Sequence, residues 1–130
     1  MALRSIAVRT DEPLQVLDIT DRVQEAVVEG ITGPVTVFSQ HTTAAITVNE
    51  AESRLLGDFE DALADLVPDT GWEHDRIDDN ADGHVRAMLV GPSETVPFEE
   101  GELRIGTWQS ILLVECDGPR KRTVTVAFED

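Results

Sequence analysis

The chain has 130 residues, 41% of them hydrophobic, and its 26 acidic residues against 10 Lys and Arg give a formal net charge of −16. This composition suits one folded domain over residues 1–130, and it argues against a nucleic-acid partner, because phosphate backbones are bound by clustered Lys and Arg. No apolar run approaches the roughly 20 residues of a membrane span, and the apolar stretch at the start of the chain is too short for a secretory signal. A single cysteine excludes an intramolecular disulfide. We therefore expect a cytoplasmic protein without a membrane partner.

The first half of the chain predicts strands alternating with two helices. A turn at residues 11–13 is expected to join the first two strands. Asp21 resembles a helix N-cap with Gln24 three residues on, and Gly30 is expected to end that helix. A second helix is expected over Glu50–Val67, where apolar residues recur at helical spacing. The expected strands of this half are Leu3–Val8, Leu14–Ile19, Gly33–Ser39 and Ala44–Val48.

The second half begins with a long acidic loop and continues mainly as strands. Asp69–Asp82 is polar, and loops of this length inside a domain are often functional. A short helix is expected over His84–Val90, and the continuously apolar segment Ile111–Val114 predicts a buried central strand. The order of elements indicates an α+β fold with mostly antiparallel pairing. The expected strands of this half are Glu94–Phe98, Glu102–Ile105, Ile111–Val114 and Thr123–Phe128.

The chain has only three histidines, and their surroundings resemble a metal site. His41 lies in a Gln-His-Thr-Thr segment at the edge of a strand, and His74 and His84 lie at the two ends of the acidic loop. Three neutral imidazoles would resemble the protein ligands of a catalytic zinc ion, which leave one position open. No HExxH or CxxC pattern is present, so a hydrogen-bonded structural role is the alternative for each histidine.

Two further segments could contact a ligand. Gly106–Gln109 is either a β-turn with a packed Trp or a site built from backbone and hydroxyl groups. Glu115–Arg122 contains the turn sequence Asp-Gly-Pro and three of the ten basic residues. Within it, Arg120 could hold a phosphate through paired hydrogen bonds, or it could pair with the acidic surface. Cys116 follows an apolar strand and is expected to be a small buried side chain.

The charge has a consequence for stability. Nine of the ten basic residues are Arg, and the acidic residues are spread along the whole chain. Self-repulsion destabilises a compact domain of such charge unless salt screens it, and the Debye length falls to roughly 3 Å at 1 M salt. The composition resembles that of proteins from salt-accumulating halophiles, so we expect a halophilic archaeal protein that is stable only in concentrated salt.

Three stretches of the chain resemble the YjbQ family, small proteins named as secondary thiamine-phosphate synthases. These stretches are His41–Glu50, His74–Pro97 and Gly101–Arg122, which include HTTAAITVNE, GTWQ and DGPR. The resemblance implies an α+β fold with an antiparallel β-sandwich of seven or eight strands and two or three helices, assembled as a homotrimer. Because all three histidines fall where the family is expected to have His, it favours a shared catalytic and metal site of His41, His74 and His84.

The activity implied by the resemblance joins a pyrimidine diphosphate to a thiazole phosphate and expels pyrophosphate. Such chemistry uses a divalent cation, here zinc with magnesium as the alternative, and cationic side chains around the leaving group. No dedicated diphosphate-binding motif is present, so two alternatives stay open. One is a metal-dependent phosphate-ester hydrolase with Glu50 or Glu115 as general base, and the other is a non-enzymatic trimeric protein that binds a metal or small ligand. The residues expected to contact the phosphorylated ligand are Thr42, Asn80, Thr107, Gln109 and Arg120.

Overall fold

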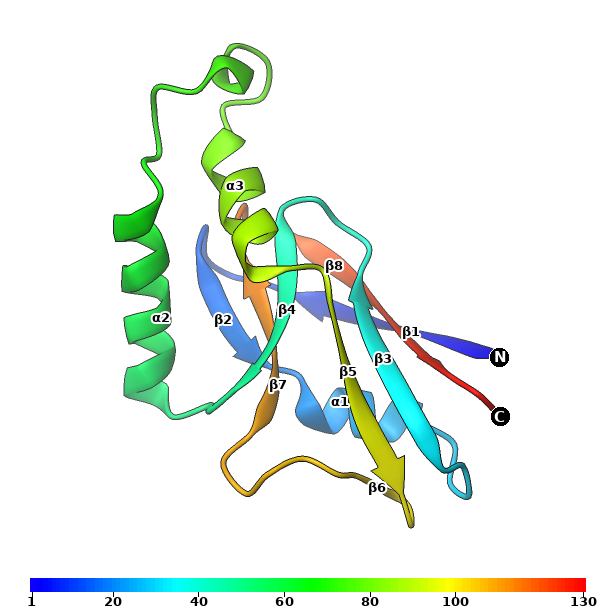
Figure 1. The fold of residues 1–130 in the computed structure, drawn as a ribbon. Helices are drawn as coiled ribbons and strands as arrows, with labels where there is room; N and C mark the ends of the chain where they lie inside the picture. Colours follow the sequence, from blue (N-terminus) through cyan, green and yellow to red (C-terminus); the bar gives the residue numbers. More distant parts are fainter.

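A computed structural model describes all residues from 1 to 130 and contains two antiparallel sheets with two helices beside the smaller one (Figure 1). The strands are β1 (Ala2–Arg9), β2 (Gln15–Asp18), β3 (Gly33–Ser39), β4 (Ala44–Asn49), β5 (Ser93–Glu99), β6 (Glu102–Leu103), β7 (Ser110–Glu115) and β8 (Lys121–Phe128). The helices are α1 (Thr20–Ala26), α2 (Ser53–Leu66), a short 3-10 helix (Glu73–Arg76) and α3 (Ala81–Val90). The expected α+β fold with an antiparallel β-sandwich of about eight strands is confirmed.

The larger apolar core lies between the two sheets. Five strands follow the order β1-β8-β3-β5-β6, and three follow the order β2-β7-β4. Strand β8 alternates strictly, and its Val124, Val126 and Phe128 point into this core. Strand β7 is buried on both faces, as its apolar run predicts: Leu113 faces the core between the sheets, whereas Leu112 belongs to a second cluster with residues of α2 and α3.

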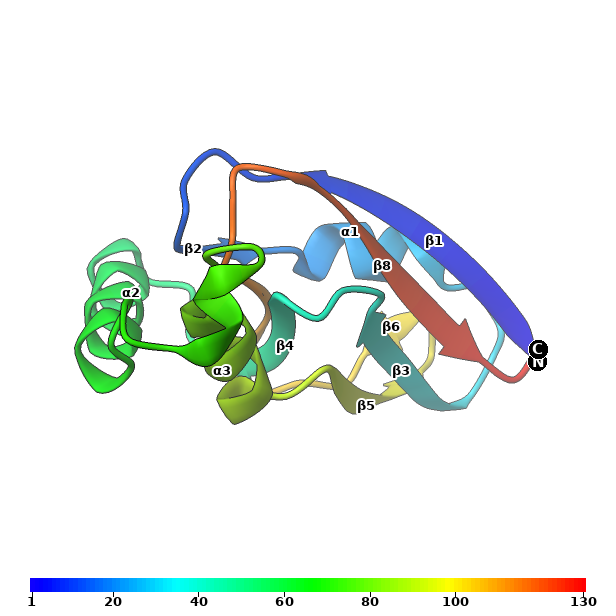
Figure 2. The same ribbon diagram turned by 90° about the horizontal axis from the view of Figure 1, so that it is seen from above.

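The two sheets separate elements that follow each other in the chain. Strand β1 pairs with β8 in the larger sheet and β2 pairs with β7 in the smaller one, so the expected turn at residues 11–13 passes from one sheet to the other. Seen from above, α2 and α3 lie together at one end of the molecule, and both termini lie at the other end (Figure 2). None of the helices is both long and apolar enough to cross a membrane.

Several expected boundaries are wrong by a few residues. Helix α1 begins at Thr20, whose amide donates to the Asp18 carboxylate at 2.9 Å, so Asp21 is not its N-cap. Helix α2 begins at Ser53 rather than Glu50, because the Glu52 side chain accepts a hydrogen bond from the Arg54 amide at 2.6 Å. The acidic loop contains a short 3-10 helix, and α3 begins before His84.

We predict that this fold depends on salt, because 26 acidic residues face only 10 basic ones on one small domain. Raising KCl from about 0.1 M to about 3 M should raise the melting temperature by roughly 10 °C or more, which corresponds to about 2–3 kcal/mol for a domain of this size. Thermal melts followed by circular dichroism measure the effect. A melting temperature that stays constant over this range would contradict the halophilic interpretation.

Candidate functional site

Two open cavities adjoin each other beside the first turn of α3, and both are lined by His41, Thr42 and His84. The first, which we call the polar cavity, has a volume of about 620 Å³ and no hydrophobic side chain in its lining. The second, which we call the mixed cavity, has about 610 Å³ and a lining that includes Phe38 and Met88. Both volumes fall within the range of about 300–1,000 Å³ typical of small-molecule sites.

Three connections of the fold meet at these cavities. The residues between β3 and β4 provide His41 and Thr42, the start of α3 provides His84, and the turn between β7 and β8 provides Arg120. Helix α3 lies directly on that turn at Gly83, where an added Cβ would lie only 2.6 Å from the carbonyl oxygen of Cys116. This close approach places His84 beside the segment Cys116–Arg122, which we call the cationic turn because it contains Arg120, Lys121 and Arg122.

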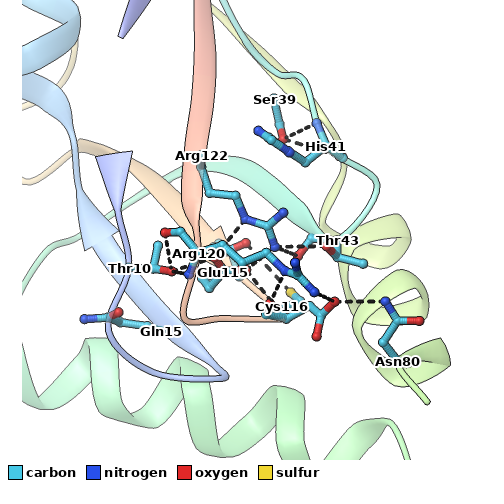
Figure 3. Close-up of polar contacts among 12 residues, drawn as sticks. Thr10, Gln15, Ser39, His41, Thr43, Asn80, Glu115, Cys116, Arg120 and Arg122 are labelled. Carbon is cyan, nitrogen blue, oxygen red and sulfur yellow. Dashed lines mark hydrogen bonds and ion pairs between the residues drawn. The ribbon is translucent and has the colours of Figure 1, made fainter. Parts of the chain in front are cut away.

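Arg122, which lines the polar cavity, forms a buried ion pair with Glu115. Figure 3 shows this pair with its neighbouring polar contacts. Arg122 donates from two nitrogens to the two carboxylate oxygens, and it also donates to the Thr43 hydroxyl at 2.9 Å. The carboxylate accepts further hydrogen bonds from the Thr10 hydroxyl at 2.7 Å and from the Asp117 amide at 3.0 Å. Glu115 is completely buried, and Arg122 is 3% exposed.

The environment of Glu115 does not suit the general base predicted for a hydrolase. Burial by itself raises the pKa of the carboxyl, but the hydrogen bonds from Arg122, the Asp117 amide and Thr10 outweigh it and bring the pKa below its ordinary value. Both carboxylate oxygens already accept strong hydrogen bonds inside the protein. Glu115 therefore holds the turn and Arg122 in place rather than facing a substrate.

One ring nitrogen of His41 is engaged inside the protein. Its Nε2 accepts a hydrogen bond from the backbone amide of Thr123 at 2.8 Å, so this nitrogen carries no proton, and neutral His41 holds its proton on Nδ1. Burial lowers the pKa of His41, and the positive charges of Arg122 and Arg120 lower it further, against an opposing effect of Glu115. His41 is therefore held as a neutral imidazole.

His74 and His84 lie in contact with each other. Their rings meet edge to face, with centroids 5.0 Å apart. The Nε2 atom of His74 is buried without a hydrogen-bond partner, and the nearest Asp78 carboxylate oxygen is 3.6 Å away. His84 thus links His74 on one side to the cavities that it shares with His41 on the other.

The three histidines do not fit a ready zinc centre within one chain. No group of three His, Cys, Asp or Glu side chains converges as metal ligands would. The Nε2 lone pair of His41 is engaged by Thr123, so this ring would have to turn before it could bind a metal. The expectation of a zinc or magnesium ion stays a prediction.

The cationic turn carries one charge that is free. Arg120 donates through Nε to the Asp117 carbonyl at 2.7 Å and through a terminal nitrogen to the Asp117 carboxylate at 2.9 Å. Asn80 donates to the same carboxylate oxygen at 2.9 Å, so Asp117 joins α3 to the turn. Arg120 thus has the internal pairing that was the alternative to anion binding, while Lys121, which also lines the polar cavity, forms no ion pair.

Five of the predicted site residues do not line these cavities: Glu115 and His74, described above, and three that lie away from the cavities, Thr107, Gln109 and Glu50. Thr107 and Gln109 belong to the turn before β7, at the opposite end of that strand from Glu115. The turn is stabilised by a bond from the Gly106 amide to the Gln109 side chain at 2.7 Å, and Trp108 is 74% exposed rather than packed. Glu50 follows β4, roughly 20 Å along the strand from the residues that line the mixed cavity.

Cys116 is buried, as expected, and burial raises its pKa to about 12, so the thiol stays protonated.

Other residues of the site were not expected from the sequence. Thr43, Asp117 and Lys121 line the polar cavity although none was named as a site residue; Asp117 and Lys121 belong to the segment Glu115–Arg122 that could contact a ligand. For Lys121 the available signal was that it is the sole lysine of an Arg-rich chain. Gly83 lies between the expected loop and the expected helix, and the sequence carried no signal for its close contact.

Comparisons with known proteins agree on one family. A family model described as "UPF0047 protein YjbQ-like" matches residues 4–129. A UPF0047 protein of Archaeoglobus fulgidus is 47% identical over 122 residues, which cover 93% of this chain and 96% of the relative. The UPF0047 protein YugU of Bacillus subtilis is 36% identical over 127 residues, which cover 93% and 94%.

Solved structures give the same result. The hypothetical protein APE1520 from Aeropyrum pernix K1 superposes with a TM-score of 0.94 at 43% identity, over 99% of this chain and 98% of that one. A YbjQ-like protein of unknown function from Sulfolobus solfataricus gives 0.87 at 38% identity, over 96% and 94%. The similarity therefore extends over nearly the whole chain in each case.

Proposed function

The chain belongs to the YjbQ/UPF0047 family, and from this premise we propose that its polar cavity binds a small phosphorylated substrate in a condensation like that of a secondary thiamine-phosphate synthase. The observation that carries the proposal is that three basic side chains, against the two carboxylates of Asp78 and Asp117, line this cavity in a chain of net charge −16. Arg120, Lys121 and Arg122 are three of only ten basic residues, and all three line this one cavity.

The free groups of the cavity suit a phosphate. Lys121 has no carboxylate partner, and Nδ1 of His41 carries a proton while Nε2 is engaged. Arg120 uses Nε and one terminal nitrogen on Asp117, which leaves its other terminal nitrogen available. Charged hydrogen bonds of this kind are stronger than neutral ones, and they act best where a pocket removes water.

In the proposed reaction, the ring nitrogen of a thiazole phosphate attacks the methylene carbon of a pyrimidine diphosphate. A carbon–nitrogen bond forms, and the carbon–oxygen bond to the diphosphate breaks, with its electron pair leaving on pyrophosphate. No proton has to move, so the contribution of the protein is to orient the two substrates and to stabilise negative charge on the leaving group. Lys121, Arg120 and the His41 N–H group are the donors proposed for this role.

A divalent metal, zinc or magnesium, also stays a proposal. It would neutralise diphosphate charge, and the Nε2 atom of His74, which has no hydrogen-bond partner, is one imidazole nitrogen that could bind it. The hydrolase alternative has less support, because Glu50 lies far along β4 and Glu115 is engaged by Arg122.

Assembly and location are further parts of the proposal. We propose a homotrimer, as the family resemblance implies, and large apolar residues exposed on and near α2 and α3, such as Leu66 and Ile77, are consistent with self-association. We also propose that the protein acts in the cytoplasm, because its single cysteine offers no disulfide framework.

We predict that the purified protein converts the pyrimidine diphosphate and the thiazole phosphate to thiamine phosphate and pyrophosphate. Replacing Lys121 with Gln should lower kcat/KM by about tenfold or more, because it removes one charged hydrogen bond of roughly 1.5–3 kcal/mol. Both products are measured by chromatography, in the presence of EDTA and again with added Zn²⁺ or Mg²⁺.

The control is Arg104→Gln, which removes one positive charge outside both cavities, where Arg104 pairs with Glu100 on the surface. It should leave the rate unchanged. Turnover of a single ester without pyrophosphate would favour the hydrolase, and binding without turnover would favour the ligand-binding protein. Absence of both binding and turnover would reject the proposed function.

A further inference from the structure

We infer that the polar and mixed cavities form one two-part site for a phosphate ester whose body is aromatic or similarly flat and apolar. The phosphate lies in the polar cavity beside Lys121, and the body lies in the mixed cavity between Phe38 and Met88. This inference rests on the proposed function, whose two substrates are such esters, and it adds the place of the ring and the residues, Phe38 and Met88, that select it.

The two cavities share a boundary that a single small ligand can cross. His41, Thr42 and His84 line both of them. On α3, His84, Ala87 and Met88 lie three and four residues apart and therefore on one face of the helix. This face begins at the polar cavity with His84 and continues into the mixed cavity with Ala87 and Met88.

The chemistry of the lining changes sharply across this boundary. The polar cavity contains no hydrophobic side chain, whereas the mixed cavity contains Phe38, Ala44, Ala87 and Met88. A ligand that is polar throughout would leave these apolar side chains uncovered, and one that is apolar throughout would leave Lys121 without a partner. Only a molecule with an anionic end and an apolar body satisfies both parts.

The apolar part is accessible in the free protein. Met88 is 72% exposed and Phe38 is 39% exposed, although both are large hydrophobic residues. An aromatic body can pack against the Phe38 ring, and Met adapts its shape and makes favourable sulfur contacts with aromatic rings. Covering these side chains gives the ligand binding energy that inorganic phosphate alone cannot obtain.

Titration calorimetry with three probes tests the inference: inorganic phosphate, glycerol phosphate and phenyl phosphate. Phenyl phosphate should bind about tenfold more tightly than glycerol phosphate, which corresponds to covering roughly 55 Å² of apolar surface. The variant Met88→Ala should remove most of this difference while leaving the affinity for inorganic phosphate unchanged. Met88 is exposed, and Ala favours the helix, so the variant should fold.

The matched control is Leu89→Ala, which removes the next residue of α3. Leu89 is similarly exposed, but it lines a separate cavity between α2, α3 and the smaller sheet. This variant should keep the preference for phenyl phosphate. Equal affinities for the two esters, or equal losses in both variants, would overturn the two-part site and leave the proposed phosphate site standing. Failure of all three probes to bind would overturn both proposals.

Discussion

Replacing Arg122 with Met should lower the free energy of unfolding by about 3–5 kcal/mol, the largest change in stability that we expect from a single side chain. The substitution leaves the completely buried Glu115 carboxylate without its charged partner, and it also removes the bond to the Thr43 hydroxyl. Met has a similar length and no charge, so the variant keeps most of the side-chain packing and loses the charge with its hydrogen bonds. Urea unfolding, followed by fluorescence in concentrated KCl, measures it.

The pH dependence identifies the cause. In the native protein the pKa of Glu115 lies below its ordinary value, so the stabilisation from this group is complete above that ordinary value and is lost as pH falls through the folded value. Without Arg122, burial raises the pKa of Glu115, so the deficit of the variant should become smaller as the pH is lowered and the carboxyl binds a proton.

Two further variants serve as controls for the ion pair. The double change Arg122→Met with Glu115→Leu should recover most of the loss, because it removes both buried charges together. Arg104→Gln, at an exposed pair with Glu100, should change the free energy of unfolding by less than about 1 kcal/mol. Equal effects of Arg122→Met and Arg104→Gln would contradict the importance of the buried pair.

Replacing Gly83 with Ala should destabilise the protein by about 1–3 kcal/mol and weaken binding of thiazole phosphate by tenfold or more. In most helices this change is favourable by about 1 kcal/mol, because Ala has the higher helix propensity. Here the new Cβ would lie 2.6 Å from the backbone oxygen of Cys116, so α3 has to move away from the turn between β7 and β8. His84, the next residue, moves with it.

The matched control is Gly57→Ala in α2, where an added Cβ meets nothing within 4 Å. This variant should be more stable than the native protein by about 0.5–1 kcal/mol and should bind thiazole phosphate normally. Thermal melts measure the stability of both variants, and titration calorimetry measures their affinity for thiazole phosphate. If Gly83→Ala is also stabilising, the close packing of α3 on the turn is not required for the site.

The local elements of this protein could be predicted from its sequence because they follow from periodicity. The alternation ending in Val124, Val126 and Phe128 predicts a half-buried strand, and β8 is one. The unbroken apolar run Ile111–Val114 predicts a central strand, and β7 lies between β2 and β4. Which strands pair with each other is harder to predict from the sequence, because β1 and β2 are joined by a short turn and still belong to different sheets.

For the candidate site, the sequence by itself identified the histidines, the cationic turn and the family resemblance, since these depend on residue type and spacing. Only the tertiary structure decided which of these groups are free to act. The Nε2 lone pair of His41 is occupied by the amide of a residue 82 positions later, and Glu115 is occupied by Arg122 from the start of the next strand. Lys121 remains free, although its sequence neighbours are paired. Such differences depend on hydrogen bonds between segments distant in the chain, and these form only when the two sheets and α3 are packed together.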